Sequence, residues 1–110
     1  MAFDAYDRSL DLLRALAPVT ERIRARDAGL ADQLRRASQS VLLNIAEANR
    51  RRGKDRANRF RCALGEAAEV SAAVEAALVA EYIEALEVVD ALALADRVRA
   101  IVYQLAKKAA

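Results

Sequence analysis

Four long segments of helical periodicity, separated by a few turn-forming residues, are the feature that most constrains the fold of this chain. In each segment apolar residues recur at intervals of three and four, the spacing of one face of an α-helix. The 110 residues include three glycines and one proline, which leaves little material for turns. The pattern predicts helices over about 4–26, 30–51, 55–80 and 82–108.

The first two predicted helices carry clear apolar stripes. In the first, a 4-3-4 spacing selects Tyr6, Leu10, Leu13, Ala17 and then Thr20, and further apolar residues at Leu12, Leu16, Val19 and Ile23 widen this face. Pro18 removes one backbone donor, so it is expected to kink this helix without ending it. Gly29 can adopt a left-handed conformation at the following break. The second stripe consists of Leu30, Leu34, Ala37, Val41, Ile45 and Ala48.

The third and fourth predicted helices follow the break at Gly53. The third stripe consists of Phe60, Ala63, Leu64, Ala67, Val70, Val74, Ala77 and Leu78, and the fourth of Val88, Ala91, Leu94, Val98, Ile101 and Leu105. Short connections between long amphipathic helices favour antiparallel neighbours. We therefore predict an all-α fold, an up-down-up-down four-helix bundle in one domain over residues 1–110.

No segment of the sequence resembles a membrane span or a secretion signal. The longest uncharged run, Ala37 to Ala46, has about half of the ~20 residues that a membrane-spanning helix needs. The single cysteine, Cys62, cannot form an internal disulfide, so a reducing compartment is expected. These features predict a cytoplasmic protein without membrane contact.

The start of the fourth helix is more apolar than one bundle core requires. From Ala85 to Ala95 the residues other than Glu87 and Asp90 are apolar, whereas a surface helix normally has one apolar side. Alanines tolerate water, but that does not account for Leu86, Val89 and Leu92 together. We expect these three to contact another copy in a homo-oligomer.

The composition argues against most catalytic chemistry. The chain has no histidine, which excludes Ser-His-Asp and Cys-His catalysis and makes ordinary zinc sites improbable. Glycine-rich cofactor loops are also missing. Cys62 is expected to be a small buried side chain, and Glu66, Glu69 and Glu75 to be solvated or paired with arginine. We predict no catalytic residue, no metal site and no cofactor.

A basic segment at the second break is the strongest local feature. From Arg50 to Arg61 the net charge is +6, whereas that of the whole chain is +2, so the remainder is acidic. Such asymmetry is typical of phosphate binding. The candidate nucleic-acid contacts are Arg50, Arg51, Arg52, Lys54, Arg56 and Arg59.

The alternative is a solvated turn. Arginines that end the second helix favour its dipole, whereas Lys54 and Arg56 oppose the dipole of the third, so helix stability does not explain those two. Phe60 is the one aromatic residue in the segment, and its phase directs it to the core. The segment therefore offers no stacking platform for bases, and contact through phosphates of RNA or DNA is expected without sequence preference.

A polar stripe follows one face of the second predicted helix: Gln33, Arg36, Ser40, Asn44, Glu47 and Arg51. Arg36 can pair with Glu69 on the third helix, with Ser40 or Asn44 completing hydrogen bonds. A small polar site is one interpretation. A structural network of Arg36, Ser40, Asn44, Glu47 and Glu69 that fixes helix register is the favoured one.

Several short motifs in and after the second and third helices form a recognisable pattern: Gln33-Leu34-Arg35-Arg36-Ala37, Ser40-Val41, Asn44-Ile45-Ala46-Glu47, Arg59-Phe60, Ala63-Leu64-Gly65-Glu66-Ala67-Ala68-Glu69 and Tyr82-Ile83. This pattern resembles that of the family of four-helix bundle proteins named for 23S ribosomal RNA intervening sequences. The chain departs from the family pattern at Leu42, Leu43, Ala48, Glu66 and Glu81, the last a position where the family has glycine. The resemblance implies a homopentameric barrel. A distantly similar accessory protein of diversity-generating retroelements binds nucleic acid and a reverse transcriptase.

Two hypotheses of function follow. The first is a non-enzymatic homo-oligomer whose basic segment contacts nucleic acid. The second is a structural or adaptor oligomer that binds a protein partner and no nucleic acid. An enzyme is the least favoured reading.

Overall fold

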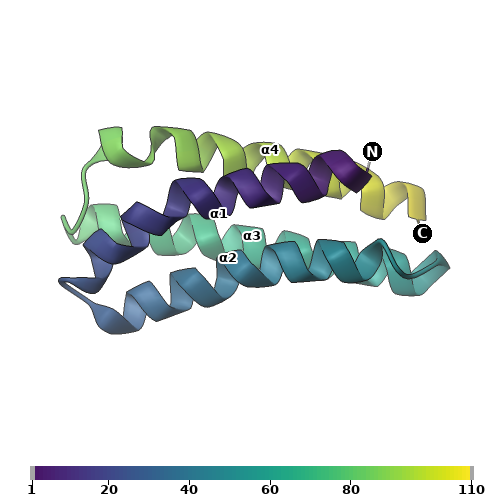
Figure 1. Cartoon of the computed structure of the whole chain (residues 1–110), viewed down its shortest axis with the longest axis horizontal. Helices are drawn as coiled ribbons and strands as arrows, with labels where there is room; N and C mark the ends of the chain where they lie inside the picture. The colour runs from purple at the N-terminus through teal and green to yellow at the C-terminus, as the bar shows by residue number, and fades with distance from the viewer. Residues whose placement is uncertain (1, 110) are drawn as a thin grey trace.

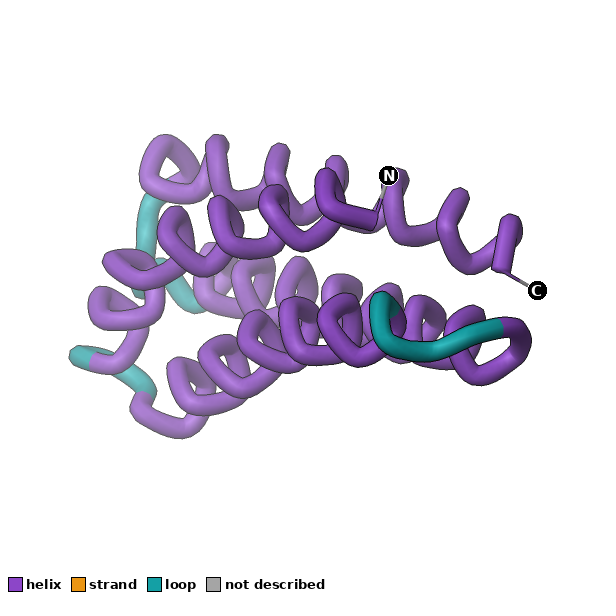
Figure 2. Tube along the Cα trace, turned by 45° about the vertical axis from the view of Figure 1, so that its right-hand side comes forward, coloured by secondary structure: helices purple, strands orange, loops and turns teal. Residues whose placement is uncertain are grey.

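Four α-helices make up the computed structural model, which describes the backbone of residues 2–109 and the side chains of residues 4–109. They are α1 (Ala2–Arg24), α2 (Ala28–Ala48), α3 (Gly53–Val79) and α4 (Ala85–Ala109). Helices α1 and α3 each pack against both α2 and α4. The α1–α2 and α3–α4 connections lie at one end of the bundle, and the α2–α3 connection lies at the end where α1 begins and α4 finishes (Figures 1 and 2). The predicted all-α fold of four helices is confirmed.

The core is built mostly from alanine, valine and leucine, which suits closely packed helices. Phe60, Leu12, Leu16, Ile23, Leu34 and Ile45 are its largest fully buried side chains. Full burial of such a side chain contributes about 1.5–3 kcal/mol. Helices α2 and α3 place most of their predicted stripes in this core, and polar residues beside those stripes bridge the two helices.

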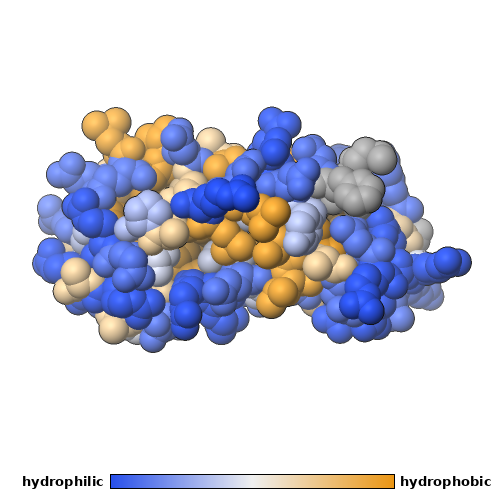
Figure 3. All heavy atoms as spheres, viewed as in Figure 1, coloured by the Kyte–Doolittle hydropathy of each residue, from blue (hydrophilic) through white to orange (hydrophobic). Residues whose placement is uncertain are grey.

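Helix α1 uses a different face from the one that its 4-3-4 spacing predicted. Tyr6, Leu10 and Leu13 are half-buried and Ala17 is exposed. The core side chains of α1 are instead those that were expected only to widen the face: Leu12, Leu16, Val19 and Ile23, with Ala5. Because α1 is apolar on two adjacent faces, periodicity alone does not identify the face that packs inward. Leu13 and Ala17 of the displaced stripe line an open groove between α1 and α2, and apolar atoms are visible on this face of the bundle (Figure 3).

The first break is organised by Asp27 rather than by glycine. The Asp27 carboxylate accepts a hydrogen bond from the Leu30 backbone N–H at 3.0 Å, so it caps the start of α2. Gly29 lies in the first turn of α2 and does not adopt the predicted left-handed conformation, which belongs to Gly53 and Glu81. Pro18 lies within α1, and the helix continues past it to Arg24.

The third break delays α4 by about one turn relative to the prediction. Glu81 has φ 61°, and its N–H and that of Tyr82 donate to the carbonyls of Leu78 and Ala77, both at 3.0 Å. This pattern ends α3 in a Schellman motif. Tyr82 was expected to begin α4, but its ring lies under the Arg26 guanidinium at 5.4 Å, and α4 begins at Ala85.

Among residues 2–109, no helix combines the length and the apolar character needed to cross a membrane.

Candidate nucleic-acid interface and polar network

The basic residues of the second break lie at one end of the bundle, where α2 passes into α3. We define the basic turn as Arg50, Arg51, Arg52, Lys54, Arg56 and Arg59. Arg52 is extended before Gly53, whose φ of 58° is a left-handed value that glycine adopts without strain. The first four members are exposed, whereas Arg56 and Arg59 are half-buried. The first four side chains are therefore accessible to a ligand, whereas the last two also pack against the bundle.

Arg51 is engaged with the carboxylate one helical turn before it. Its Nε and Nη2 donate to Oε1 of Glu47 at 2.9 and 2.7 Å. The hydrogen bond with Arg51, and then the charges of Arg51, Arg50 and Arg59, hold the pKa of Glu47 below its ordinary value. Glu47 is thus the partner of Arg51 in the basic turn, and it forms no hydrogen bond with the described residues of the polar network in which we had placed it.

Arg56 links the end of α2 to the start of α3. Its Nη1 donates to the Ala48 carbonyl at 3.1 Å, and its guanidinium lies 5.1 Å from the centre of the Phe60 ring. The Ala48 carbonyl also accepts a hydrogen bond from the Arg51 backbone N–H at 3.0 Å, so Arg56 adds a second bond to this carbonyl at the C-terminus of α2. The expectation that helix stability does not explain Arg56 is therefore wrong. Phe60 is fully buried, as its phase predicted.

Three exposed cations of the basic turn remain without a side-chain partner in the described part of the chain: Arg50, Arg52 and Lys54. Each presents its charge to solvent at the same end of the molecule. A cation without an internal carboxylate partner breaks no ion pair when it binds an external phosphate. Binding through these three cations therefore has the lowest free-energy cost.

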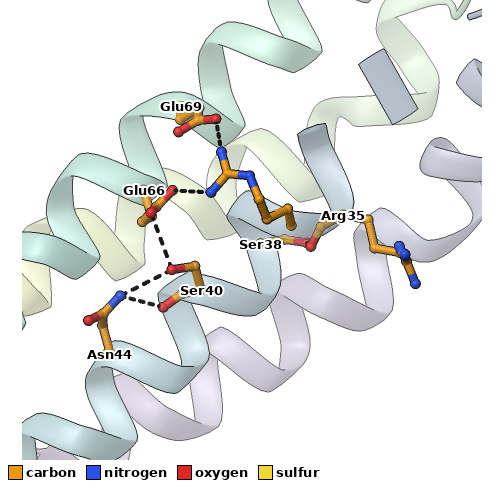
Figure 4. Close-up of polar contacts among 7 residues, drawn as sticks. Arg35, Ser38, Ser40, Asn44, Glu66 and Glu69 are labelled. Atoms are coloured by element: carbon orange, nitrogen blue, oxygen red, sulfur yellow. Dashed lines mark hydrogen bonds and ion pairs between the residues drawn. The ribbon is translucent and has the colours of Figure 1, made fainter. Parts of the chain in front are cut away.

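A polar network joins α2 to α3 farther along the bundle (Figure 4). Arg36 donates to Glu69 and its Nη1 lies 3.6 Å from Oε1 of Glu66. Ser40 Oγ donates to Oε2 of Glu66 at 3.2 Å, and Nδ2 of Asn44 donates to the carbonyl and Oγ of Ser40 at 2.9 and 3.1 Å. Arg35 points away from this cluster, and Ser38 bonds only to the Arg35 carbonyl, at 3.0 Å.

Glu66 is paired with Arg36, in agreement with the expectation of a solvated or arginine-paired carboxylate. It also accepts a hydrogen bond from Ser40, which makes it a member of the network in which we had not placed it. Its spacing of three residues before Glu69 places both on the α2 side of α3. The network has two carboxylates, one guanidinium, a hydroxyl and an amide, which suits a link between helices. Within residues 2–109 no cluster of potential ligands has the arrangement that would hold a metal ion.

Three of the five large hydrophobic residues that are exposed in the described part of the chain flank the α3–α4 connection, and the other two are Leu43 and Tyr103. Leu86 is 88% exposed and Val89 55%, whereas Leu92 is half-buried against the core. Val79, at the end of α3, is 86% exposed and was not anticipated. We call Val79, Leu86 and Val89, which flank the α3–α4 connection, the exposed apolar patch.

Cys62 is exposed, which corrects the prediction that it is buried. It follows the buried Phe60 by two residues, or about 200° around the helix, so it lies on the opposite side of α3.

The comparisons with known proteins agree with this fold. The family model described as "23S rRNA-intervening sequence protein" matches residues 1–104. A crystal structure of a protein of unknown function, from the S23 ribosomal protein family of Bacteroides thetaiotaomicron VPI-5482, is similar with a TM-score of 0.86. That similarity covers 94% of this chain and 98% of the other, at 21% sequence identity. No curated protein matches the chain.

Proposed function

The chain belongs to the 23S rRNA-intervening sequence protein family, and we propose that it is a non-enzymatic protein whose basic turn binds nucleic acid through phosphate groups. The observation that carries this proposal is the set of exposed, unpartnered cations at Arg50, Arg52 and Lys54. The turn presents them together, although the rest of the chain is net acidic. Contact through phosphates needs no base recognition, so little sequence preference is expected.

Self-association is the second part of the proposal. Copies of an antiparallel up-down-up-down bundle would meet through Leu86 and Val89 at the start of α4 and Val79 at the end of α3, because these large apolar side chains are exposed in the single chain. The outer face of α3 supports this proposal, since its exposed positions from Cys62 to Val79 include one charged residue, Glu75. The resemblance to the family implies five copies. Such a ring would bring five basic turns to one rim and increase its attraction for a polyanion.

A cytoplasmic location completes the proposal. Cys62 is exposed and has no second cysteine in the chain with which to pair, which suits a reducing compartment.

A salt titration of binding to labelled RNA and DNA tests the main proposal. The structure selects Arg50→Glu, Arg52→Glu and Lys54→Glu as the combined variant, because Arg51 and Arg56 also have internal partners. The matched control carries Arg14→Glu, Arg35→Glu and Arg97→Glu, which make the same charge change at exposed positions elsewhere. Each phosphate contact contributes about 0.7–0.9 to the salt slope, so the turn variant should lower that slope by about 2–3 while the control changes it little. Equal effects of both variants, or no binding at low salt, would reject the proposal.

An adaptor that binds a protein is the alternative, and one observation favours it. Leu13, Leu16, Ala17 and Thr20 of α1 border an open groove of about 350 Å³ with Arg35, Ser38 and Gln39 of α2. A partner helix could dock its apolar side there. A protein that co-purifies with the chain, together with the absence of nucleic-acid binding at low salt, would favour this function.

A further inference from the structure

An exposed tyrosine lies among basic side chains on the α3–α4 side of the bundle. Tyr103 is 53% exposed and borders two shallow hollows. The first, of about 410 Å³, is lined by Arg61, Leu64, Tyr103, Ala106 and Lys107. The second, of about 460 Å³, is lined by Leu64, Asp96, Arg99, Ala100 and Tyr103. Tyr103 and Leu64 line both hollows, so open space adjoins the tyrosine ring.

The charges around this ring are mostly positive. The Lys107 ammonium lies 5.5 Å from the ring centre, and Arg61 is exposed without a side-chain partner among the described residues. Arg99 borders the second hollow, 3.8 Å from Asp96, which is the carboxylate that lines it. Three cations against one carboxylate would attract an anionic ligand and would repel a basic one.

These cations continue the basic turn along the bundle. Lys54 and Arg61 are seven residues apart on α3, so they share a helix face about 10 Å apart at 1.5 Å per residue. Lys107 and Lys108 end α4 at the same end of the molecule as the α2–α3 connection (Figure 1). A strand held by its phosphates at the basic turn can thus pass Arg61 and reach Tyr103.

We propose that Tyr103 stacks on an unpaired base of a single-stranded nucleic acid whose adjacent phosphates contact Arg61 and Lys107. This inference rests on the proposed function and narrows its ligand to single strands. A tyrosine ring beside a basic track is the arrangement by which proteins hold single strands, since every base has a face that stacks and a duplex keeps its bases covered. Lys107 has a flexible stem, so its ammonium can leave the ring for a phosphate when a base arrives.

The site lay outside the sequence prediction because its parts are distant in the chain. The one aromatic residue within the basic segment, Phe60, is buried and offers no stacking face. Tyr103 comes from α4, and the packing of α4 on α3 brings it beside Arg61.

Three probes of equal length separate stacking from phosphate contact: an oligothymidylate, the same strand without bases, and a duplex. A length of about 12 nucleotides is within the usual range for one binding site. Tyr103→Ala should weaken oligothymidylate binding by about tenfold, which is typical of one stacked base, and should leave the abasic strand and the duplex within about twofold. Gln104→Ala, at the adjacent exposed position, is the matched control and should bind all three probes as the unmodified protein does.

A second variant gives a readout that does not depend on affinity. The chain has no tryptophan, so Tyr103→Trp introduces a single indole fluorophore at the site. Oligothymidylate and oligouridylate should both quench its emission, and the abasic strand should not. Comparison of oligouridylate, an RNA, with oligothymidylate, a DNA, shows whether the site distinguishes ribose from deoxyribose.

The outcomes separate this inference from the proposed function. If the basic-turn variant loses binding to every probe while Tyr103→Ala binds as the unmodified protein does and the indole emission of Tyr103→Trp is unchanged, phosphate binding stands and stacking is rejected. If the unmodified protein binds none of the probes at low salt, both are rejected. Selective loss of oligothymidylate binding in Tyr103→Ala, with base-dependent quenching in Tyr103→Trp, supports the stacking site.

Discussion

At the scale of single residues, Glu81 holds a backbone conformation that suits glycine. Its φ of 61° is left-handed, which costs an L-residue about 1–2 kcal/mol, and the resembled family has glycine at this position. Glu81→Gly should therefore raise the free energy of unfolding by about 1 kcal/mol, since the added flexibility of the unfolded chain offsets part of the gain. Urea denaturation measures the change.

The matched control is Glu75→Gly, because both glutamates are exposed and only Glu81 is left-handed. Glu75 lies inside α3, where glycine should lower stability by about 1 kcal/mol. If both substitutions changed the free energy of unfolding in the same direction, the backbone of Glu81 would not be strained.

The ion pair of Glu47 and Arg51 predicts a local dependence on pH. Arg51 lowers the folded-state pKa of Glu47, so the pair stabilises the fold above the unfolded pKa of about 4.3 and loses that effect as pH falls through the folded pKa. In Arg51→Gln the pKa of Glu47 should rise towards its ordinary value. An NMR titration of the Glu47 carboxyl carbon measures this shift, and an unchanged pKa would show that the pair does not form in solution.

At the scale of helices and their connections, Arg56 is expected to stabilise the fold, whereas Lys54 is expected to bind nucleic acid. Substitutions at these two residues should therefore have different effects. Arg56→Gln removes the bond to the Ala48 carbonyl and the contact with Phe60, so it should lower the free energy of unfolding by about 1 kcal/mol. Lys54→Gln should leave stability within about 0.5 kcal/mol, because the side chain is exposed. It should also reduce the salt slope of nucleic-acid binding by about 1.

Urea denaturation and salt titration of both variants test this division. A destabilised Lys54→Gln, or a fully stable Arg56→Gln, would contradict the roles assigned to the two side chains.

The helices show which features the sequence could predict. Their number and type followed from periodicity, which is strong in α2 because one face is apolar and the adjacent face polar. In α1 two apolar faces compete, and the choice of Leu12 and Leu16 over Leu10 and Leu13 depends on packing between helices. The start of α4 was predicted too early, because glutamate does not indicate a left-handed residue in the way that glycine would, and the turn at Glu81 was therefore missed.

The candidate site was predictable only where its residues are close in sequence or share a helix face. The basic turn is a run in the sequence, and the Arg36–Glu69 pair followed from two helix faces expected to meet. Arg56 is different, because its bond to Ala48 depends on the path of the connection between α2 and α3. Tyr103 depends on which side of α4 packs against α3, and that is a property of the folded bundle.

At the scale of the whole molecule, the exposed apolar patch and the basic turn lie near opposite ends of a bundle with a longest extent of 42 Å. Association through the patch would leave the turn free. A ring of identical copies uses two different surfaces of each subunit, so Leu86 and Val89 would face another part of the neighbouring copy. Nucleic-acid binding and assembly should therefore be separable by mutation.

Leu86→Asp with Val89→Asp should convert the assembly to a monomer of 12.0 kDa, because each buried carboxylate would face an apolar surface without a partner. Gln104→Asp, an exposed polar position on the same helix, should leave the assembly intact. Light scattering after size exclusion measures the mass, and circular dichroism checks that the helices remain. The monomer should keep its affinity for a short oligonucleotide that spans one subunit, but it should bind a long strand more weakly, since the gain from several linked sites is lost. An unmodified protein that is itself monomeric, or a double variant that keeps its mass, would show that this patch does not hold copies of the chain together.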